Sequence, residues 1–179
     1  YSVWPRRFYQ RIKRVEQMNQ KNTIRVKECF TNANNDEKKG MKHKGLIVVK
    51  PNNKKAIEYV NKAKMNLELC GFYKEKGFDY KIPEEWFYTL YYCALAILSR
   101  IGIESRNQKC TALFLRYAKE NGFIDYDDEF IDRITVYRAK EKKSDVDERE
   151  EARYSSSIES EEIIQKYNYM NEICKKAIA

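Results

Sequence analysis

Residues 86–98 read "WFYTLYYCALAIL" and form the most apolar stretch of the chain. Pro83 stands just before this stretch and is followed by Glu84 and Glu85. A proline in the first turn and acids near the positive end of the helix dipole are typical of a helix start. The pattern therefore predicts a helix from Pro83 to about Arg100. Because this helix has almost no polar face, we expect it to be the central helix of the fold or a dimer face.

Four further segments carry apolar residues at helical spacing. The chain of 179 residues has only 6 Gly and 3 Pro, so long helices fit it better than many short strands. The side chains of Asn107 and Ser160 are suitable N-caps for two of these segments. We therefore predict an all-α fold with a short extended segment, "LIVV", ahead of its first helix. Two of the four expected helices cover about 53–71 and 107–122, and the other two begin near residues 125 and 160.

The net charge of +8 belongs to the N-terminal part of the chain. Residues 1–44 hold 12 of the 35 Lys and Arg residues and only 4 of the 27 Asp and Glu residues, so residues 45–179 are formally neutral. We expect residues 1–44 to form a basic N-terminal arm with its linker, and residues 45–179 to form the helical body. Residues 31–45 are rich in Asn, Gly and charge, and we expect a loop between arm and body there.

The segment "WPRRFYQRIKRVEQ", residues 4–17, has the pattern of a basic amphipathic helix. Its apolar stripe lies beside a basic stripe that consists of Arg7, Arg11 and Arg14. One interpretation is a helix that contacts nucleic acid, an acidic partner or an anionic surface. The other is a helix that docks on the body by its apolar face, with its arginines merely in solvent.

Cysteine and histidine usage argues against a disulfide framework and a zinc site. The cysteines are odd in number and widely spaced, with no C-x-x-C pair: Cys29, Cys70, Cys93, Cys110 and Cys174. We interpret them as reduced core thiols in a cytoplasmic protein. The only histidine, His43, lies among lysines, and we expect it to be exposed and to bind no metal.

Other site types are also disfavoured. The sequence has no G-x-x-x-x-G-K-[ST], G-x-G-x-x-G or G-x-S-x-G motif, so we expect no cofactor. No apolar run approaches the roughly 20 residues of a membrane span, and we expect no membrane contact. Four acids near the start of the helix expected from about residue 125 are interpreted either as Mg²⁺ ligands or as solvated charge that interacts favourably with the helix dipole. They are Asp127, Asp128, Glu129 and Asp132.

Four segments together resemble the HEPN domain family. The segment "FYTLYYCALAILSRIGIES", residues 87–105, is similar to the second helix of that family, and residues 44–70 are similar to the first helix of its archaeal-type members. The segment "REEARY", residues 149–154, resembles the late arginine motif of the branch with R-x-x-A-x-Y, and residues 155–178 are similar to the closing helix. The resemblance covers roughly residues 45–178.

The resemblance implies an antiparallel four- or five-helix bundle, commonly a homodimer in which arginines of both subunits face a shared cleft. Many family members are metal-independent ribonucleases, often toxins that pair with a nucleotidyltransferase antitoxin. In these ribonucleases, a His serves as the acid–base catalyst and an Arg binds phosphate. Here Tyr154 stands where catalytic members carry His. Because a phenol has a pKa of about 10, it is a poor proton shuttle at neutral pH, whereas Arg149 keeps its value for bidentate phosphate binding.

Further arginines are candidates for the same cleft. Arg138 lies eleven residues before Arg149, which is about three helical turns if the fourth helix is continuous. No Pro or Gly ends that helix before Tyr154, so it either runs long or breaks near Ser144. Arg100, at the end of the central helix, is the other candidate.

These residues leave ordinary structural alternatives open. Arg149 is also placed for a surface ion pair with Asp145, one helical turn earlier, and Tyr154 for a core contact with the last helix. Three functions remain. The favoured one is a HEPN-like dimer that binds RNA, a nucleotide or a partner protein with little or no catalysis. The second is a metal-independent ribonuclease that uses Arg149 and Tyr154. The third is an assembly or antitoxin-linked module whose basic arm binds a partner, for example a nucleotidyltransferase.

Overall fold

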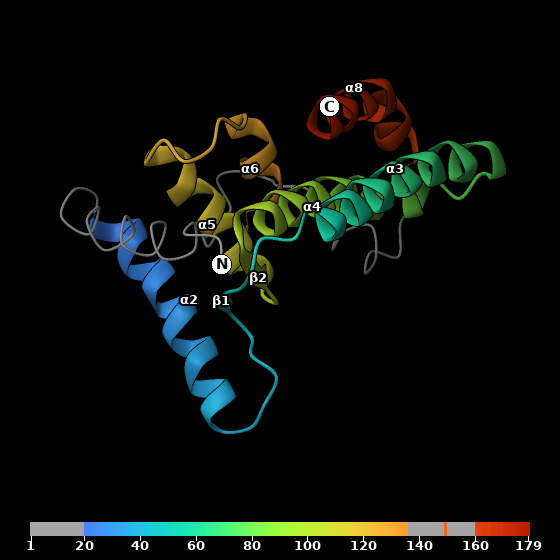
Figure 1. Cartoon of the computed structure of the whole chain (residues 1–179). Helices are drawn as coiled ribbons and strands as arrows, with labels where there is room; N and C mark the ends of the chain where they lie inside the picture. Colours follow the sequence, from blue (N-terminus) through green and yellow to red (C-terminus); the bar gives the residue numbers. More distant parts are fainter. Residues whose placement is uncertain (1–19, 136–148, 150–159) are drawn as a thin grey trace. The chain divides into compact units, whose positions relative to one another are not determined.

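The computed structural model of the chain describes residues 20–135, 149 and 160–179. These residues are mostly helical, so the all-α prediction is confirmed (Figure 1). The described part also contains a small antiparallel sheet of two strands. The elements are α2 (Gln20–Lys38), β1 (Leu46–Val48), α3 (Asn53–Lys76), η1 (Asp79–Lys81), α4 (Ile82–Ile101), β2 (Ile103–Ser105), α5 (Gln108–Glu120), α6 (Asp128–Ile134) and α8 (Ser160–Ile178). None of the described helices is long and apolar enough to cross a membrane.

The chain divides into two compact units. Unit 1 comprises Tyr1–Ala56 and Ala94–Tyr126, and unit 2 comprises Ile57–Cys93 and Asp127–Ala179. Both boundaries fall inside helices, so α3 and α4 each contribute residues to both units. Residues 1–19 lie outside the described residues, and the basic helix with Arg7, Arg11 and Arg14 stays a prediction.

In unit 1, α2 packs against α5 and β1. Val26 and Ala33 of α2 are buried, and the ring of Phe30 meets the ring of Phe114 edge to face at 6.2 Å. The segment that we expected to be a loop at 31–45 is therefore helical through Lys38. The expectation was wrong because the Asn and charged residues cover the exposed side of a helix whose other side is buried. Helix α2 ends before Gly40, whose φ of +71° is the left-handed conformation of a glycine C-cap.

A disulfide between Cys29 and Cys110 links α2 to α5 in unit 1. The expectation that all five cysteines are reduced thiols is therefore wrong for this pair. The two residues are 81 positions apart, and no spacing rule in the sequence connects them. The other three, Cys70, Cys93 and Cys174, are free and buried, as expected. The prediction of a cytoplasmic location was based on five reduced thiols, and the disulfide removes this argument for it.

The two strands of unit 1 pair with Leu46 opposite Ser105 and Val48 opposite Ile103. Leu46 and Ile103 are buried. The predicted extended segment is thus a strand, and its partner β2 was not predicted. Gly102 precedes β2 with φ of +87°, and a Cβ there would lie 2.7 Å from the backbone oxygen of Val49. A glycine at this position lets the chain turn from α4 into the sheet.

Helix α5 has the predicted boundaries. The side chain of Asn107 accepts a hydrogen bond from the backbone N–H of Cys110 at 3.0 Å, which caps the helix start. At the other end, Gly122 has φ of +69°, and the N–H of Phe123 donates to the carbonyl of Ala118 at 2.8 Å. Capping residues therefore located this helix correctly from sequence.

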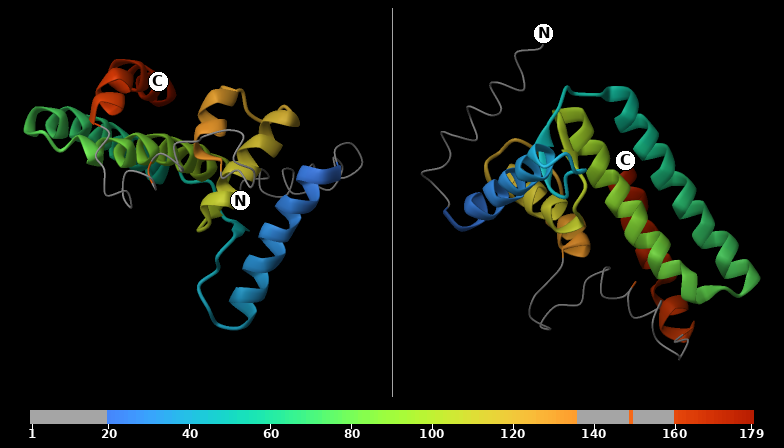
Figure 2. Two further views of the ribbon diagram at one scale, coloured as in Figure 1. Left: turned by 180° about the vertical axis from the view of Figure 1, so that it is seen from behind. Right: turned by 90° about the horizontal axis from the view of Figure 1, so that it is seen from below.

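In unit 2, the α3 and α4 residues form an antiparallel hairpin, with the two helices side by side (Figure 2). Helix α4 begins where Pro83, Glu84 and Glu85 predicted. The expected end of α3 near Gly71 is wrong, because the helix continues to Lys76 and a positive-φ glycine, Gly77, follows it. Helix α8 begins at Ser160 as predicted and buries Met170, Ile173 and Cys174.

The helix that begins at Asp128 does not run long. α6 ends at Ile134, and Thr135 is extended, with ψ of 132°. The Thr135 hydroxyl donates to the carbonyl of Ile131 at 2.6 Å, so a side chain rather than the next turn binds this carbonyl. A helix that continues from Asp128 to Arg138 is therefore ruled out. Arg138 itself lies outside the described residues, and its place in a cleft stays a prediction.

Candidate nucleic-acid interface

Arg149 contacts the aromatic side of α4 in unit 2. Its guanidinium carbon lies 4.3 Å from the ring centroid of Phe87 and 5.8 Å from that of Tyr88. Both distances are within the range of cation–π attraction. Asp145, the partner of the alternative ion pair, lies outside the described residues, as does Tyr154. The motif arginine is thus placed on a ring surface, half-buried.

The rings continue from Arg149 as a row across the hairpin. Phe87 meets Tyr88 at 5.2 Å, Tyr88 meets Tyr92 at 6.0 Å, and Tyr92 stacks on Tyr59 of α3 at 6.0 Å with 20° between planes. We call these four residues the aromatic row. At its α3 end, the Lys62 amine lies 5.5 Å from the Tyr92 centroid and 5.9 Å from that of Tyr59. The aromatic row therefore has a cation at each end.

Helical spacing and a close helix–helix approach build this row. Tyr88 and Tyr92 are four residues apart, so they lie on the same side of α4. The Thr89 hydroxyl donates to the carbonyl of Glu85 at 2.8 Å and lies 3.4 Å from the carbonyl of Ala63 on α3. Ala63 is fully buried, and its small side chain lets the two helices approach. This contact brings Tyr59 against Tyr92.

Burial raises the pKa of two titratable groups, one in the aromatic row and one next to it on α4. It raises the pKa of the Tyr92 phenol, and the neighbouring Tyr88 and Tyr59 add to the effect. Burial is also the largest cause of the raised pKa of Glu85, followed by repulsion from Glu84. At neutral pH the Tyr92 phenol is therefore uncharged and can donate a hydrogen bond.

Two predicted site residues belong to different units. Arg100 is exposed in the last turn of α4 and belongs to unit 1, whereas Arg149 belongs to unit 2. Their shared cleft stays a prediction. In the opposite direction, sequence reasoning missed Tyr59, Lys62 and Tyr92. One signal for the row was present in the sequence, the tyrosines at positions 88 and 92, which are four residues apart. Packing alone needs only Phe or Leu, whereas tyrosine favours a position in which its hydroxyl reaches a polar surrounding.

The acidic residues at the start of α6 serve structural roles. The Asp127 carboxylate accepts from the backbone N–H of Glu129 at 2.9 Å, and the Glu129 carboxylate pairs with Arg133 at 3.0 Å. The Tyr169 hydroxyl also donates to Glu129 at 3.0 Å. Among the described residues, no group of three or more His, Cys, Asp or Glu side chains is arranged to hold a metal ion.

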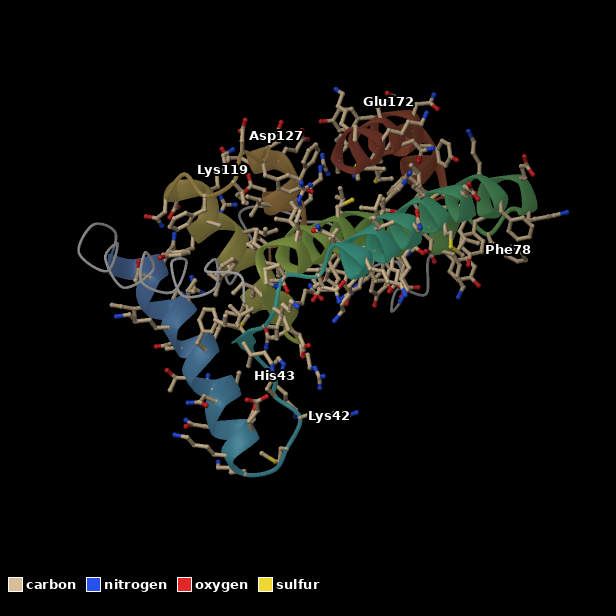
Figure 3. The ribbon with its side chains drawn as sticks, in the orientation of Figure 1. Lys42, His43, Phe78, Lys119, Asp127 and Glu172 are labelled. Atoms are coloured by element: carbon tan, nitrogen blue, oxygen red, sulfur yellow. A yellow bond between two sulfur atoms is a disulfide. The ribbon has the colours of Figure 1, made fainter. Side chains whose placement is uncertain are left out.

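His43 is buried in unit 1, with 3% of its surface exposed, so the expectation of a solvated histidine is wrong. Figure 3 shows Lys42 pointing away from the chain and His43 lying against it. The N–H of Gly45 donates to His43 Nδ1 at 3.4 Å, so Nε2 carries the proton and donates to Glu104 at 2.9 Å. Glu104 lies on β2, the strand that was not predicted, which is why the sequence concealed this pair. Both ring nitrogens are occupied by structural hydrogen bonds.

Comparisons with protein-family models, with curated proteins and with solved structures found no match to this chain.

Proposed function

We propose that this chain is a HEPN-like helical module that binds single-stranded RNA on the aromatic row of unit 2, with little or no catalysis of its own. The observation that carries the proposal is the part of the aromatic row that solvent reaches, the half-buried rings of Tyr88, Tyr92 and Tyr59, with Arg149 over the fully buried Phe87 at one end and Lys62 at the other. The resemblance of "REEARY" to the late arginine motif, whose Arg binds phosphate, supports Arg149 as the phosphate-binding residue at its end of the row.

The chemistry of the row suits an unpaired strand. Bases of single-stranded RNA stack on aromatic side chains, whereas paired bases in a duplex do not present their faces. A guanidinium that contacts a ring keeps N–H donors in its plane for bidentate binding of a phosphate. Lys62 is exposed and supplies a point charge for a second phosphate. Alternating stacking and phosphate contacts is the usual pattern of sequence-tolerant binding.

Weak catalysis follows from the same residues. A phenol in water has a reference pKa of about 10, and burial raises the pKa of the Tyr92 phenol above its ordinary value. A phenol of this kind does not exchange a proton readily at neutral pH. Cleavage of RNA in EDTA by the wild type, lost in Arg149→Ala, would instead establish the ribonuclease. A nucleotidyltransferase-type partner stays a prediction from the resemblance.

Stacking is tested with a fluorescently labelled single-stranded RNA and a duplex of the same sequence, measured by polarisation at fixed salt. Tyr92→Ala is expected to lose about 1–3 kcal/mol of binding, or roughly 5- to 150-fold in Kd. Tyr169→Ala is the matched control, because Tyr169 is an exposed tyrosine of the same unit outside the row. Equal affinity for Tyr92→Ala and wild type, with the fold intact by circular dichroism, would refute the proposal.

Two lysines of α3 provide a second matched pair. Lys62 lies over rings of the row, whereas Lys74 lies over the ring of Tyr167 at 4.2 Å, outside the row. We expect Lys62→Ala to reduce the slope of log Kd against log salt by about 1, as the loss of one phosphate contact does. Lys74→Ala should leave the slope unchanged. An equal reduction of the slope in both variants would indicate a general effect of net charge and would argue against a specific phosphate contact at Lys62.

A further inference from the structure

The positive charge of the described residues lies in unit 1. Its described residues, 20–56 and 94–126, contain 15 Lys and Arg but only 6 Asp and Glu. The described residues of unit 2 contain 10 Lys and Arg and 13 Asp and Glu. A surface with a large surplus of one sign attracts ligands of the opposite sign. Unit 1 therefore has a charge that suits an anionic ligand, and the aromatic row of unit 2 does not use this charge.

The surplus is concentrated around the two-stranded sheet. Residues 38–57, which contain β1, include seven lysines and no Asp or Glu. Arg106 stands just beyond the end of β2, and its backbone N–H donates to the carbonyl of Gly45 at 3.1 Å. We give the name basic sheet surface to the five cations that reach solvent here: Lys42, Lys44, Lys50, Lys55 and Arg106.

Backbone pairing fixes the positions of these cations. Lys44 precedes β1 and Lys50 follows it, and the N–H of Val49 donates to the carbonyl of Gly102 at 2.9 Å at the Lys50 end. Because Lys44 and Lys50 are six residues apart, their backbones are separated by at most about 20 Å. A double helix carries roughly one phosphate charge per 2 Å of its axis, so several phosphates fit along this distance.

Carboxylates neutralise only part of the charge of the basic sheet surface. Glu104 lies 3.1 Å from Nε of Arg106 and 4.0 Å from the amine of Lys55. Asp36 accepts a hydrogen bond from the backbone N–H of Lys44 at 2.9 Å. These two carboxylates face five cations, and the remaining positive charges repel one another. Bound phosphates would relieve this repulsion.

The described residues of unit 1 provide no exposed ring for stacking. Their large exposed apolar side chains are Ile24, Met41 and Val48, whereas those of unit 2 include Phe72 and Tyr169. Unpaired bases bind by stacking on rings. A duplex hides its base faces and is recognised by its shape and its dense phosphates. Cations without neighbouring rings therefore suit a duplex better than a single strand.

We infer that the basic sheet surface of unit 1 binds the sugar–phosphate backbone of double-stranded RNA. It is a second site, for a class of ligand different from the unpaired strand proposed for the aromatic row. The choice of RNA rests on the proposed function, whereas the choice of a duplex rests on the charge and the exposed side chains of unit 1. Phosphate contacts carry no sequence information, so duplexes of unrelated sequence should bind equally well.

The salt dependence of binding tests this surface. A labelled blunt RNA duplex of about 20 base pairs is titrated with the full chain by polarisation at several salt concentrations. Lys50→Ala, Arg106→Ala should reduce the slope of log Kd against log salt by about 2, because two phosphate contacts are lost. Lys42→Ala, Lys44→Ala should do the same while it leaves the pair of Arg106 with Glu104 intact.

The matched control is Lys76→Ala, Lys176→Ala, which removes two positive charges from exposed lysines of unit 2. It should leave the slope unchanged. An unchanged slope in both test variants, with the fold intact by circular dichroism, would overturn the inference. An equal reduction in the test and control variants would also overturn it, because the effect would then follow from net charge alone.

Tyr92→Ala distinguishes the two sites. It should weaken single-strand binding and leave the Kd for the duplex unchanged. If it weakened duplex binding while the lysine variants had no effect, the duplex would bind at the aromatic row and this inference alone would fail. If it left single-strand binding unchanged while Lys50→Ala, Arg106→Ala still reduced the duplex slope, the proposed function would fail and this inference would stand.

Two further probes test the class of ligand. A second duplex of unrelated sequence should have a similar Kd, and a preference of about tenfold or more for one sequence would overturn a backbone site. Vesicles that contain phosphatidylserine present the same negative charge on a membrane. Vesicle binding that the Lys42→Ala, Lys44→Ala variant abolishes, together with no duplex binding by the wild type, would assign the surface to a membrane and overturn the inference.

Discussion

Unit 1 and unit 2 use the same residue types in different ways. The cysteines of unit 1 form a covalent link between α2 and α5, whereas those of unit 2 are free thiols in its core. The cations differ in the same manner. In unit 1, Lys55, Arg106 and His43 all lie within 4.0 Å of the carboxylate of one residue, Glu104. In unit 2, Lys62 and Arg149 lie over aromatic rings, and ion pairs such as that of Arg133 with Glu129 join neighbours on the same helix.

The difference shows what each unit adds to its apolar core. Both units bury large aromatic and aliphatic side chains, such as Phe114 and Tyr117 in unit 1 and Trp86 and Phe87 in unit 2. Unit 1 also joins segments that are distant in sequence by a disulfide and an ion cluster. In unit 2, burial raises the pKa of Cys70 and of Cys93 to about 12. These thiols remain protonated and unreactive at neutral pH. Reducing conditions should therefore act on unit 1 and not on unit 2.

The largest expected effect concerns the core of unit 2. Trp86 is almost fully buried, and its indole N–H donates to the side chain of Asn171 on α8 at 3.1 Å. Trp86→Ala should lower the free energy of unfolding by about 3–5 kcal/mol, because it removes a large side chain and leaves a cavity. Urea denaturation followed by circular dichroism measures the change. Trp86→Phe, which keeps most of the volume, should lose less. A loss below about 1 kcal/mol for the alanine variant would contradict the assignment of cohesion to this core.

The next effect concerns the link in unit 1. Reduction of the Cys29–Cys110 disulfide, or the pair of substitutions Cys29→Ala and Cys110→Ala, should destabilise the protein by about 2–4 kcal/mol. The reason is that the link restricts the unfolded chain over 81 residues. Denaturation with and without a reductant measures this loss. The double variant is its own control, because reductant should not destabilise it further. If reductant destabilised the wild type and the double variant equally, the effect of the reductant would not come from the Cys29–Cys110 disulfide.

The same contrast explains how much of the fold the sequence predicted. Helix starts and ends came from local capping residues such as Asn107, Gly122 and Pro83, whose action needs only neighbours in sequence. The disulfide, the pair of Glu104 with His43 and strand β2 each need a partner brought close by the fold. None of these has a local signal, and unit 1 depends on all of them.

The candidate site was predicted in part for the same reason. The motif singled out Arg149, and the apolar stretch 86–98 predicted the central helix that carries Phe87. That Arg149 lies over Phe87 of that helix, 62 positions away, is a tertiary contact that no spacing rule states. Lys62 is one of many lysines in the sequence, and only its position over two rings distinguishes it.

The smallest effect concerns the ion cluster of unit 1. The hydrogen bond from His43 is the main cause that lowers the pKa of Glu104 below its usual 4.5, with Arg106 and Lys55 contributing while partial burial opposes them. A carboxylate with a lowered pKa stabilises the fold at pH values above 4.5, and this contribution is lost as the pH falls toward the lowered pKa. Glu104→Gln should therefore cost about 1–2 kcal/mol at pH 7.

Stability of the Glu104→Gln variant should also decline less steeply than that of the wild type as the pH falls below 4.5, because the substituted residue has no proton to bind. Urea denaturation at a series of pH values measures both curves. Glu28→Gln is the matched control, since Glu28 is an exposed carboxylate of the same unit, on α2. Its curve should run parallel to that of the wild type. Parallel curves for Glu104→Gln as well would mean that the cluster adds nothing, and unit 1 would then depend on its disulfide and packing alone.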